Sequence, residues 1–226
     1  MLLSELFSRC LNAKYKNAGA AANYKTEREG DSLYIFFEWS NGTVDWLRNF
    51  DFPITVCHGC GRNILAHRGF VKAWSEALPW VEADILDPEV KSIISVGYSH
   101  GAALALLCHG FAWQERPDIR EYIHGWGFGA PRVLFGKRAR KSPRYEGFSV
   151  IRNINDIVTH LPPRILGYSH PGHLIEIGKR GKYSATDAHR SENILSELEL
   201  YERSHSFPAL KERLFSERLS EQDSSS

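Results

Sequence analysis

Gly97-Tyr98-Ser99-His100-Gly101 is a G-x-S-x-G pentapeptide between a strand-like stretch and a helix-like stretch. Residues 92–96 are short, apolar and rich in β-branched side chains, which is typical of a buried strand. Residues 102–108 are small and apolar on every side and predict a buried helix. A tight turn between such elements favours glycines beside the serine and leaves its hydroxyl exposed. The pattern therefore predicts a nucleophilic Ser99, and a plain strand–turn–helix is the alternative.

Length and composition are those of a globular chain with one sizeable core. The chain has 226 residues, of which 42% are hydrophobic and 24% charged, and its formal net charge is +1. This charge gives no strong attraction to nucleic acid. The first residues contain Glu5 and Arg9, which interrupt any signal-like apolar run, and we see no stretch of membrane-spanning length. A cytoplasmic location is the default expectation, and release by another route stays open.

The order of predicted elements indicates an α/β fold. We expect one domain over residues 1–220 and a polar, disordered tail at 221–226. The expected helices and strands alternate, and a mostly parallel central sheet flanked by helices follows from that alternation. The expected helices cover residues 1–25, 69–81, 102–116 and 192–215, and the expected strands cover 33–37, 52–57, 92–96, 123–128 and 149–154, with a hairpin over 174–184.

A serine hydroxyl needs a histidine base, and that histidine needs an acid to orient it. In the α/β-hydrolase fold the acid follows the serine in the chain, at the end of a later strand. Asp156 comes directly after the strand-like residues 149–154 and is the predicted acid. A turn-capping aspartate is the alternative reading of Asp156. Asp118 comes too early, and Asp187 is the weaker candidate.

The histidine base is harder to choose, because the chain has ten histidines. The base should lie on a late loop that reaches back to Ser99. His205 comes last, in a polar stretch that Pro208 interrupts, and we predict that it is the base. His189 is the second candidate. Structural roles are expected for the other histidines after Asp156, which are His160, His170 and His173.

The cysteines include one close pair, Cys57 and Cys60, in a C-x-x-C sequence. A zinc site normally takes its four ligands from two such clusters, and this chain has no second cluster. No thioredoxin-like pattern surrounds the pair. We therefore favour two free thiols, with a metal site and a disulfide as alternatives, and we expect no metal.

Several segments together resemble the class 3 lipases, the fungal triacylglycerol lipase-like branch of the α/β-hydrolases. The matching segments follow in the family's order over residues 37–205. They are Phe37-Glu38-Trp39-Ser40 with Asp45-Trp46, His67-Arg68-Gly69-Phe70, the elbow at 97–101, Gly127-Phe128-Gly129-Ala130-Pro131-Arg132-Val133, Asn153-Ile154-Asn155-Asp156 with Leu161-Pro162-Pro163, Gly167-Tyr168-Ser169-His170, and His205-Ser206.

The resemblance implies an oxyanion hole and a lid. The oxyanion donors would be the backbone N–H of His100 and the backbone N–H, with the hydroxyl, of Ser40. The family's lid would correspond to residues 41–52, where Trp46, Phe50 and Phe52 could line the acyl site or belong to the core.

The chain also departs from the family pattern next to these residues. Glu38-Trp39 stands in place of Arg-Gly, and His100-Gly101-Ala102 stands in place of Leu-Gly-Gly.

We conclude that the sequence predicts a serine hydrolase acting on a carboxylic, lipid-type ester, with no cofactor. Ser99, Asp156 and His205 would form the triad. The predicted partners are a lipid or small ester and, transiently, a lipid surface. Two alternatives remain: a catalytically impaired relative that binds an acyl ligand or a protein, and a metal- or thiol-based function at Cys57 and Cys60.

Overall fold

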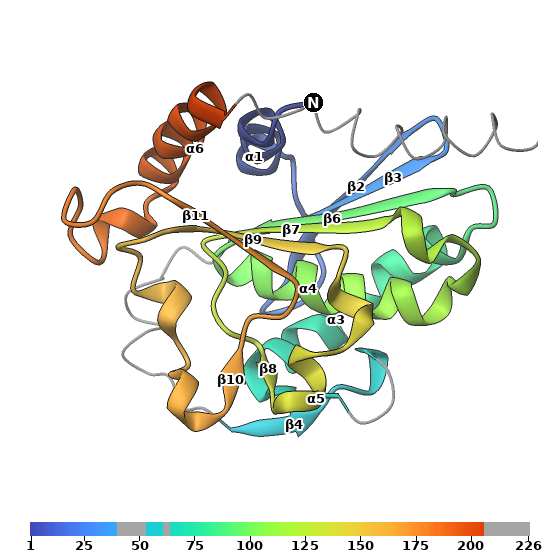
Figure 1. Ribbon diagram of the computed structural model, residues 1–226. Helices are drawn as coiled ribbons and strands as arrows, with labels where there is room; N and C mark the ends of the chain where they lie inside the picture. Colours follow the sequence, from blue (N-terminus) through green and yellow to red (C-terminus); the bar gives the residue numbers. More distant parts are fainter. Residues whose placement is uncertain (40–52, 61–63, 206–226) are drawn as a thin grey trace, which may run out of the picture.

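The computed structural model describes residues 1–39, 53–60 and 64–205, and for Arg140 and His205 it describes the backbone alone. A central sheet lies between two helical layers (Figure 1). Helices α1 (Leu3–Asn12) and α6 (Ser191–His205) cover one face, and α3 (Arg68–Leu86) and α4 (His100–Glu115) cover the other. The single α/β domain with helices on both faces agrees with the sequence prediction.

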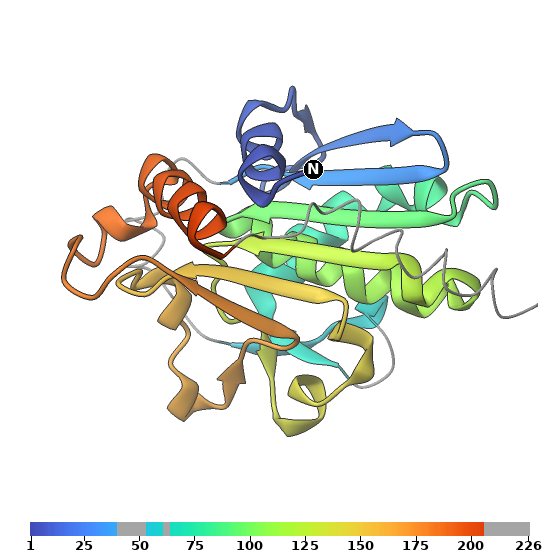
Figure 2. The same ribbon diagram turned by 45° about the horizontal axis from the view of Figure 1, so that its top comes forward.

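The central sheet has seven strands in the order β1-β2-β3-β6-β7-β9-β11. Five neighbouring strands, β3, β6, β7, β9 and β11, run parallel, and β1 and β2 add an antiparallel edge. Figure 2 shows this sheet with α1 and α6 lying across it. The strands are β1 (Lys16–Asn17), β2 (Asn23–Glu29), β3 (Ser32–Phe37), β6 (Ser92–Tyr98), β7 (Ile123–Phe128), β9 (Phe148–Asn153) and β11 (His173–Ile177).

Strand β3 shows how the sheet is buried on both faces. Leu33, Ile35 and Phe37 belong to the core on the α3 and α4 side. Tyr34 and Phe36 belong to the core beneath α1 and α6. This alternation follows from the two-residue period of a strand, and it explains why the whole segment is apolar.

Helix α4 is uniformly apolar because neighbours surround it. Its residues contact β6 and β7 on one side and α3 on the other. Every residue from Gly101 to Ala112 is buried. The helix that begins at the pentapeptide is therefore the centre of the larger core, and its first turn is held firmly in place.

A second, smaller sheet lies beyond α3 and α4 (Figure 1). It is antiparallel, with strand order β10-β8-β5-β4. Its strands are β4 (Ile54–Val56), β5 (Leu65–His67), β8 (Leu134–Phe135) and β10 (Tyr168–Ser169). The remaining helical segments are η1 (His58–Cys60), η2 (Pro117–Tyr122), α5 (Lys137–Arg140), η3 (Pro143–Tyr145), η4 (Val158–His160), η5 (Arg164–Leu166) and η6 (Asp187–His189).

Two local expectations are wrong. The first helix ends at Asn12 instead of reaching residue 25, because the following residues form β1 and a turn leading into β2, which pairs with β3. The expected hairpin at 174–184 is a single strand, β11, which pairs with β9 in parallel. The expected tail at 221–226 lies outside the described residues.

Candidate active site

Ser99 lies at a sharp turn between β6 and α4. It adopts φ 54° and ψ −119°, and it is the one described non-glycine residue with a positive φ. Positive φ costs an L-residue about 1–2 kcal/mol, so the surrounding structure must hold this conformation.

Glycines beside Ser99 allow the close packing that holds the turn. A Cβ atom at Gly97 would overlap the carbonyl group of Gly101, and one at Gly101 would overlap the carbonyl oxygen of Phe37. The backbone N–H of Ser99 donates to the carbonyl oxygen of Phe128 at 2.9 Å. The turn is thus fixed by both neighbouring strands, β3 and β7.

The Ser99 hydroxyl faces the ring of His189. Nε2 of His189 lies 2.8 Å from Oγ of Ser99, and Nδ1 lies 2.8 Å from Oδ2 of Asp156. The exposed fractions are 1% for Ser99, 5% for His189 and 0% for Asp156. The three side chains therefore form one continuous, buried row of hydrogen bonds, in the arrangement that a nucleophile, its base and an orienting carboxylate require.

Asp156 is oriented by the turn after β9. Its Oδ1 accepts a hydrogen bond from the N–H of Val158 at 2.8 Å, which leaves Oδ2 directed at His189. Thr159 donates its hydroxyl proton to the carbonyl oxygen of Asp156 at 2.9 Å. An aspartate held in this way keeps the imidazole in the tautomer that accepts a proton at Nε2.

His189 is held from both sides. The Tyr98 hydroxyl donates to the carbonyl oxygen of His189, and the two rings stack with centroids 5.3 Å apart. On another side is Gly129, at φ 57°, where a Cβ atom would come within 3.0 Å of the imidazole. The sequence does not mark Tyr98 and Gly129 as supports of the site, because they act only through this packing.

The imidazole beside Ser99 is that of His189, the second candidate, and not that of His205, the predicted base. His189 closes η6, just before α6 begins at Ser191. His205 is the last residue of α6, about 21 Å along the helix from Ser191 at 1.5 Å per residue. The predicted acid Asp156 and nucleophile Ser99 do come together.

His100 is the first residue of α4, directly after Ser99. The first N–H groups of a helix have no partner within the helix, and they favour negative charge. The backbone N–H of His100 is thus at the position expected for an oxyanion donor. The second expected donor, Ser40, lies outside the described residues, as do Trp46, Phe50 and Phe52 of the expected lid.

The imidazole of His100 is half-buried and packs against Phe70. Its centroid lies 5.6 Å from that of Phe70. Burial, with His67 nearby, lowers the pKa of His100 to about 4, so the ring is neutral at neutral pH.

The C-x-x-C pair forms a disulfide between Cys57 and Cys60, which corrects the preference for free thiols. Residues 57–60 turn through the short helix η1, and this turn brings the two sulfur atoms together. Within residues 1–39, 53–60 and 64–205, no three His, Cys, Asp or Glu side chains are grouped so that they could hold a metal ion. No helix in these ranges is both long and apolar enough to cross a bilayer.

Comparison with known proteins identifies one family. The profile described as "Lipase (class 3)" matches residues 34–166 of this chain. The lipase of Rhizomucor miehei is 29% identical over 161 residues, which cover 63% of this chain and 42% of that protein. This chain therefore spans about two fifths of the length of that curated relative.

Solved lipase structures share the fold. The Rhizomucor miehei triacylglyceride lipase superposes with a TM-score of 0.63 at 23% identity, covering 74% of this chain and 66% of the other. A triacylglycerol lipase whose catalytic centre is formed by a serine protease triad superposes with a TM-score of 0.65, at the same identity and coverage. The α/β-hydrolase fold expected from the sequence is confirmed.

Proposed function

The chain belongs to the class 3 lipase family, and on that premise we propose that it is a serine hydrolase that cleaves carboxylic esters of lipid type. The observation that carries the proposal is the buried row of hydrogen bonds that joins Ser99, His189 and Asp156. Each ring nitrogen of His189 lies 2.8 Å from an oxygen atom of its partner. Its geometry matches the roles of nucleophile, base and orienting acid in ester hydrolysis. A serine triad also forms the catalytic centre of a structural relative.

In the first half of the reaction, Oγ of Ser99 attacks the ester carbonyl carbon while Nε2 of His189 accepts the hydroxyl proton. Asp156 accepts the hydrogen bond from Nδ1 and stabilises the imidazolium that forms. His189 then gives its proton to the leaving alkoxide oxygen as the C–O bond breaks. The alcohol departs, and the acyl group remains on Ser99.

In the second half, water attacks the acyl-serine. His189 accepts a proton from the water and returns it to Oγ of Ser99 as the carboxylic acid leaves. In both halves the carbonyl oxygen gains negative charge. We assign its stabilisation to the backbone N–H of His100 and to Ser40, and such donors contribute about 3–4 kcal/mol each.

The proposed substrates are lipid esters, met in part at a lipid surface. This follows the family and the named activity of the structural relatives, which are triacylglycerol lipases. No reaction step calls for a metal or an organic cofactor.

Hydrolysis of p-nitrophenyl butyrate tests the proposal. We expect wild-type protein to release p-nitrophenol with saturation kinetics. Ser99→Ala removes the nucleophile and should lower kcat by about 10⁶-fold, while the circular-dichroism spectrum is unchanged. A Ser99→Ala variant with wild-type kcat would refute the assignment. A wild-type protein that lacks turnover would favour the acyl- or protein-binding alternative.

A further inference from the structure

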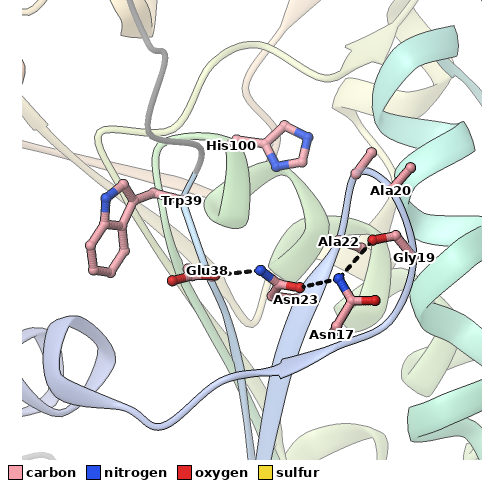
Figure 3. Close-up of a pocket in the computed structure, with 9 residues that line it drawn as sticks. Asn17, Gly19, Ala20, Ala22, Asn23, Glu38, Trp39 and His100 are labelled. Atoms are coloured by element: carbon pink, nitrogen blue, oxygen red, sulfur yellow. Dashed lines mark hydrogen bonds between the residues drawn. The ribbon is translucent and has the colours of Figure 1, made fainter.

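A polar hollow of about 200 Å³ lies beside the elbow, between the loop from β1 to β2 and the end of β3 (Figure 3). The His100 imidazole, from the start of α4, lies at one side of this hollow. Apart from the aromatic Trp39, the other lining residues are small or polar, and they are Asn17, Gly19, Ala20, Ala21, Ala22, Asn23 and Glu38.

The polar lining residues are connected to one another. Nδ2 of Asn23 donates to Oε2 of Glu38 at 2.6 Å, and Nδ2 of Asn17 donates to Oδ1 of Asn23 at 3.0 Å (Figure 3). A carboxylate has about four acceptor positions. Glu38 is therefore positioned by Asn23 and retains capacity to accept hydrogen bonds from a ligand.

The charge and protonation of the lining restrict the ligand. Glu38 is the one charged side chain among the described lining residues, so a phosphate or carboxylate would be repelled. A neutral imidazole such as that of His100 donates from one nitrogen and accepts at the other. Hydroxyl groups, which also donate and accept, suit this combination better than anions or alkyl chains do.

The volume also restricts the ligand. The hollow measures about 200 Å³. Drug-sized ligands occupy pockets of about 300–1,000 Å³. The hollow is therefore suited to a compact polar group and not to a long acyl chain.

The hollow adjoins the elbow through His100. His100 directly follows Ser99, and its ring lines the hollow while its N–H is the proposed oxyanion donor. Trp39 directly precedes Ser40, and its ring lies 5.8 Å from that of Tyr98. Glu38, Trp39 and His100 are also positions where the sequence departs from the family pattern.

We propose that this hollow is an alcohol subsite for the free hydroxyls of a partly acylated polyol. The proposal rests on the hydrolase function proposed above and names its substrate class: monoesters of polyhydroxy alcohols, in preference to fully acylated or simple alkyl esters. Glu38 accepts a hydrogen bond from one hydroxyl, and His100 pairs with another.

Three butyrate esters test the subsite. Monobutyrin carries free hydroxyls, tributyrin carries none, and ethyl butyrate has a simple alkyl alcohol. We expect wild-type kcat/KM for monobutyrin to exceed that for either other ester by about tenfold, as one hydrogen bond to a charged group would give. Two variants test the lining: Glu38→Gln keeps an acceptor for Asn23, and Ala20→Phe fills the hollow. Each should lower the ratio of kcat/KM for monobutyrin to kcat/KM for ethyl butyrate about tenfold.

The matched control is Glu82→Gln, a glutamate on the exposed side of α3, which should keep the wild-type ratio. Wild-type turnover of ethyl butyrate without a preference for monobutyrin would overturn the subsite and leave the hydrolase function standing. A preference that survives both Glu38→Gln and Ala20→Phe would also overturn it. Absence of turnover with all three esters would overturn the hydrolase function, and the subsite with it.

Discussion

Gly129→Ala is the substitution whose effect on the triad can be worked out most fully. Gly129 has φ 57°, and an added Cβ would lie 3.0 Å from Cε1 of His189, 3.1 Å from its Nδ1 and 3.3 Å from Oδ2 of Asp156. Ordinary van der Waals contact begins at 3.4 Å, so the imidazole must move by a few tenths of an ångström. The left-handed backbone adds about 1–2 kcal/mol of strain, which a domain of ordinary stability survives.

We expect kcat for p-nitrophenyl butyrate to fall about tenfold, since a 1 Å misplacement at an active site can cost about 10²-fold. KM should change little. Gly30→Ala is the matched control, because Gly30 has φ 62° and nothing lies within 4 Å of its added Cβ. Denaturant unfolding should show a similar loss of stability in both variants. The reasoning fails if Gly129→Ala keeps the wild-type kcat, or if Gly30→Ala loses as much activity.

Three further predictions concern stability. Tyr98→Phe leaves the buried carbonyl oxygen of His189 without its hydroxyl donor and should lower the free energy of unfolding by about 1–3 kcal/mol in urea titration; an unchanged midpoint would contradict this. Burial lowers the pKa values of His100, His109 and His170 to about 4, so between pH 6.5 and 4 the unfolded chain binds protons that the native protein does not. Stability should therefore fall as the pH is lowered through this window, by up to about 3 kcal/mol per histidine, and His109→Gln should flatten the dependence measured by thermal unfolding. Replacing Cys57 and Cys60 together by serine opens a very short loop and should cost at most about 2 kcal/mol, whereas a larger loss in calorimetry would show another role for the bridge.

The nucleophile and the acid could be predicted because each depends on local order along the chain. Ser99 lies in a strand–turn–helix motif whose glycines are visible in the sequence. Asp156 comes at the end of an apolar strand, and the carboxyl ends of parallel strands share one edge of the sheet. Both predictions therefore required only the strand order of the fold.

The base could not be predicted in the same way, because its position depends on how the chain returns after β11. The segment between β11 and α6 brings η6 back to the sheet edge, and no periodic pattern marks that path. His205-Ser206 is the more family-like sequence. His205, however, is the last residue of α6, whereas His189 lies just before its first residue, so the whole helix separates the two histidines. The polar hollow was equally hidden, since it joins residues 17–23 to residues 38, 39 and 100.

Intact-mass measurement after reaction with a fluorophosphonate tests the triad most directly. The serine must be activated by its base before it attacks the phosphorus atom, so the adduct reports the assembled Ser99–His189 pair. The account predicts one adduct on wild type and on His205→Ala, and none on Ser99→Ala or His189→Ala within the same reaction time. An adduct that persists in His189→Ala but disappears in His205→Ala would contradict it.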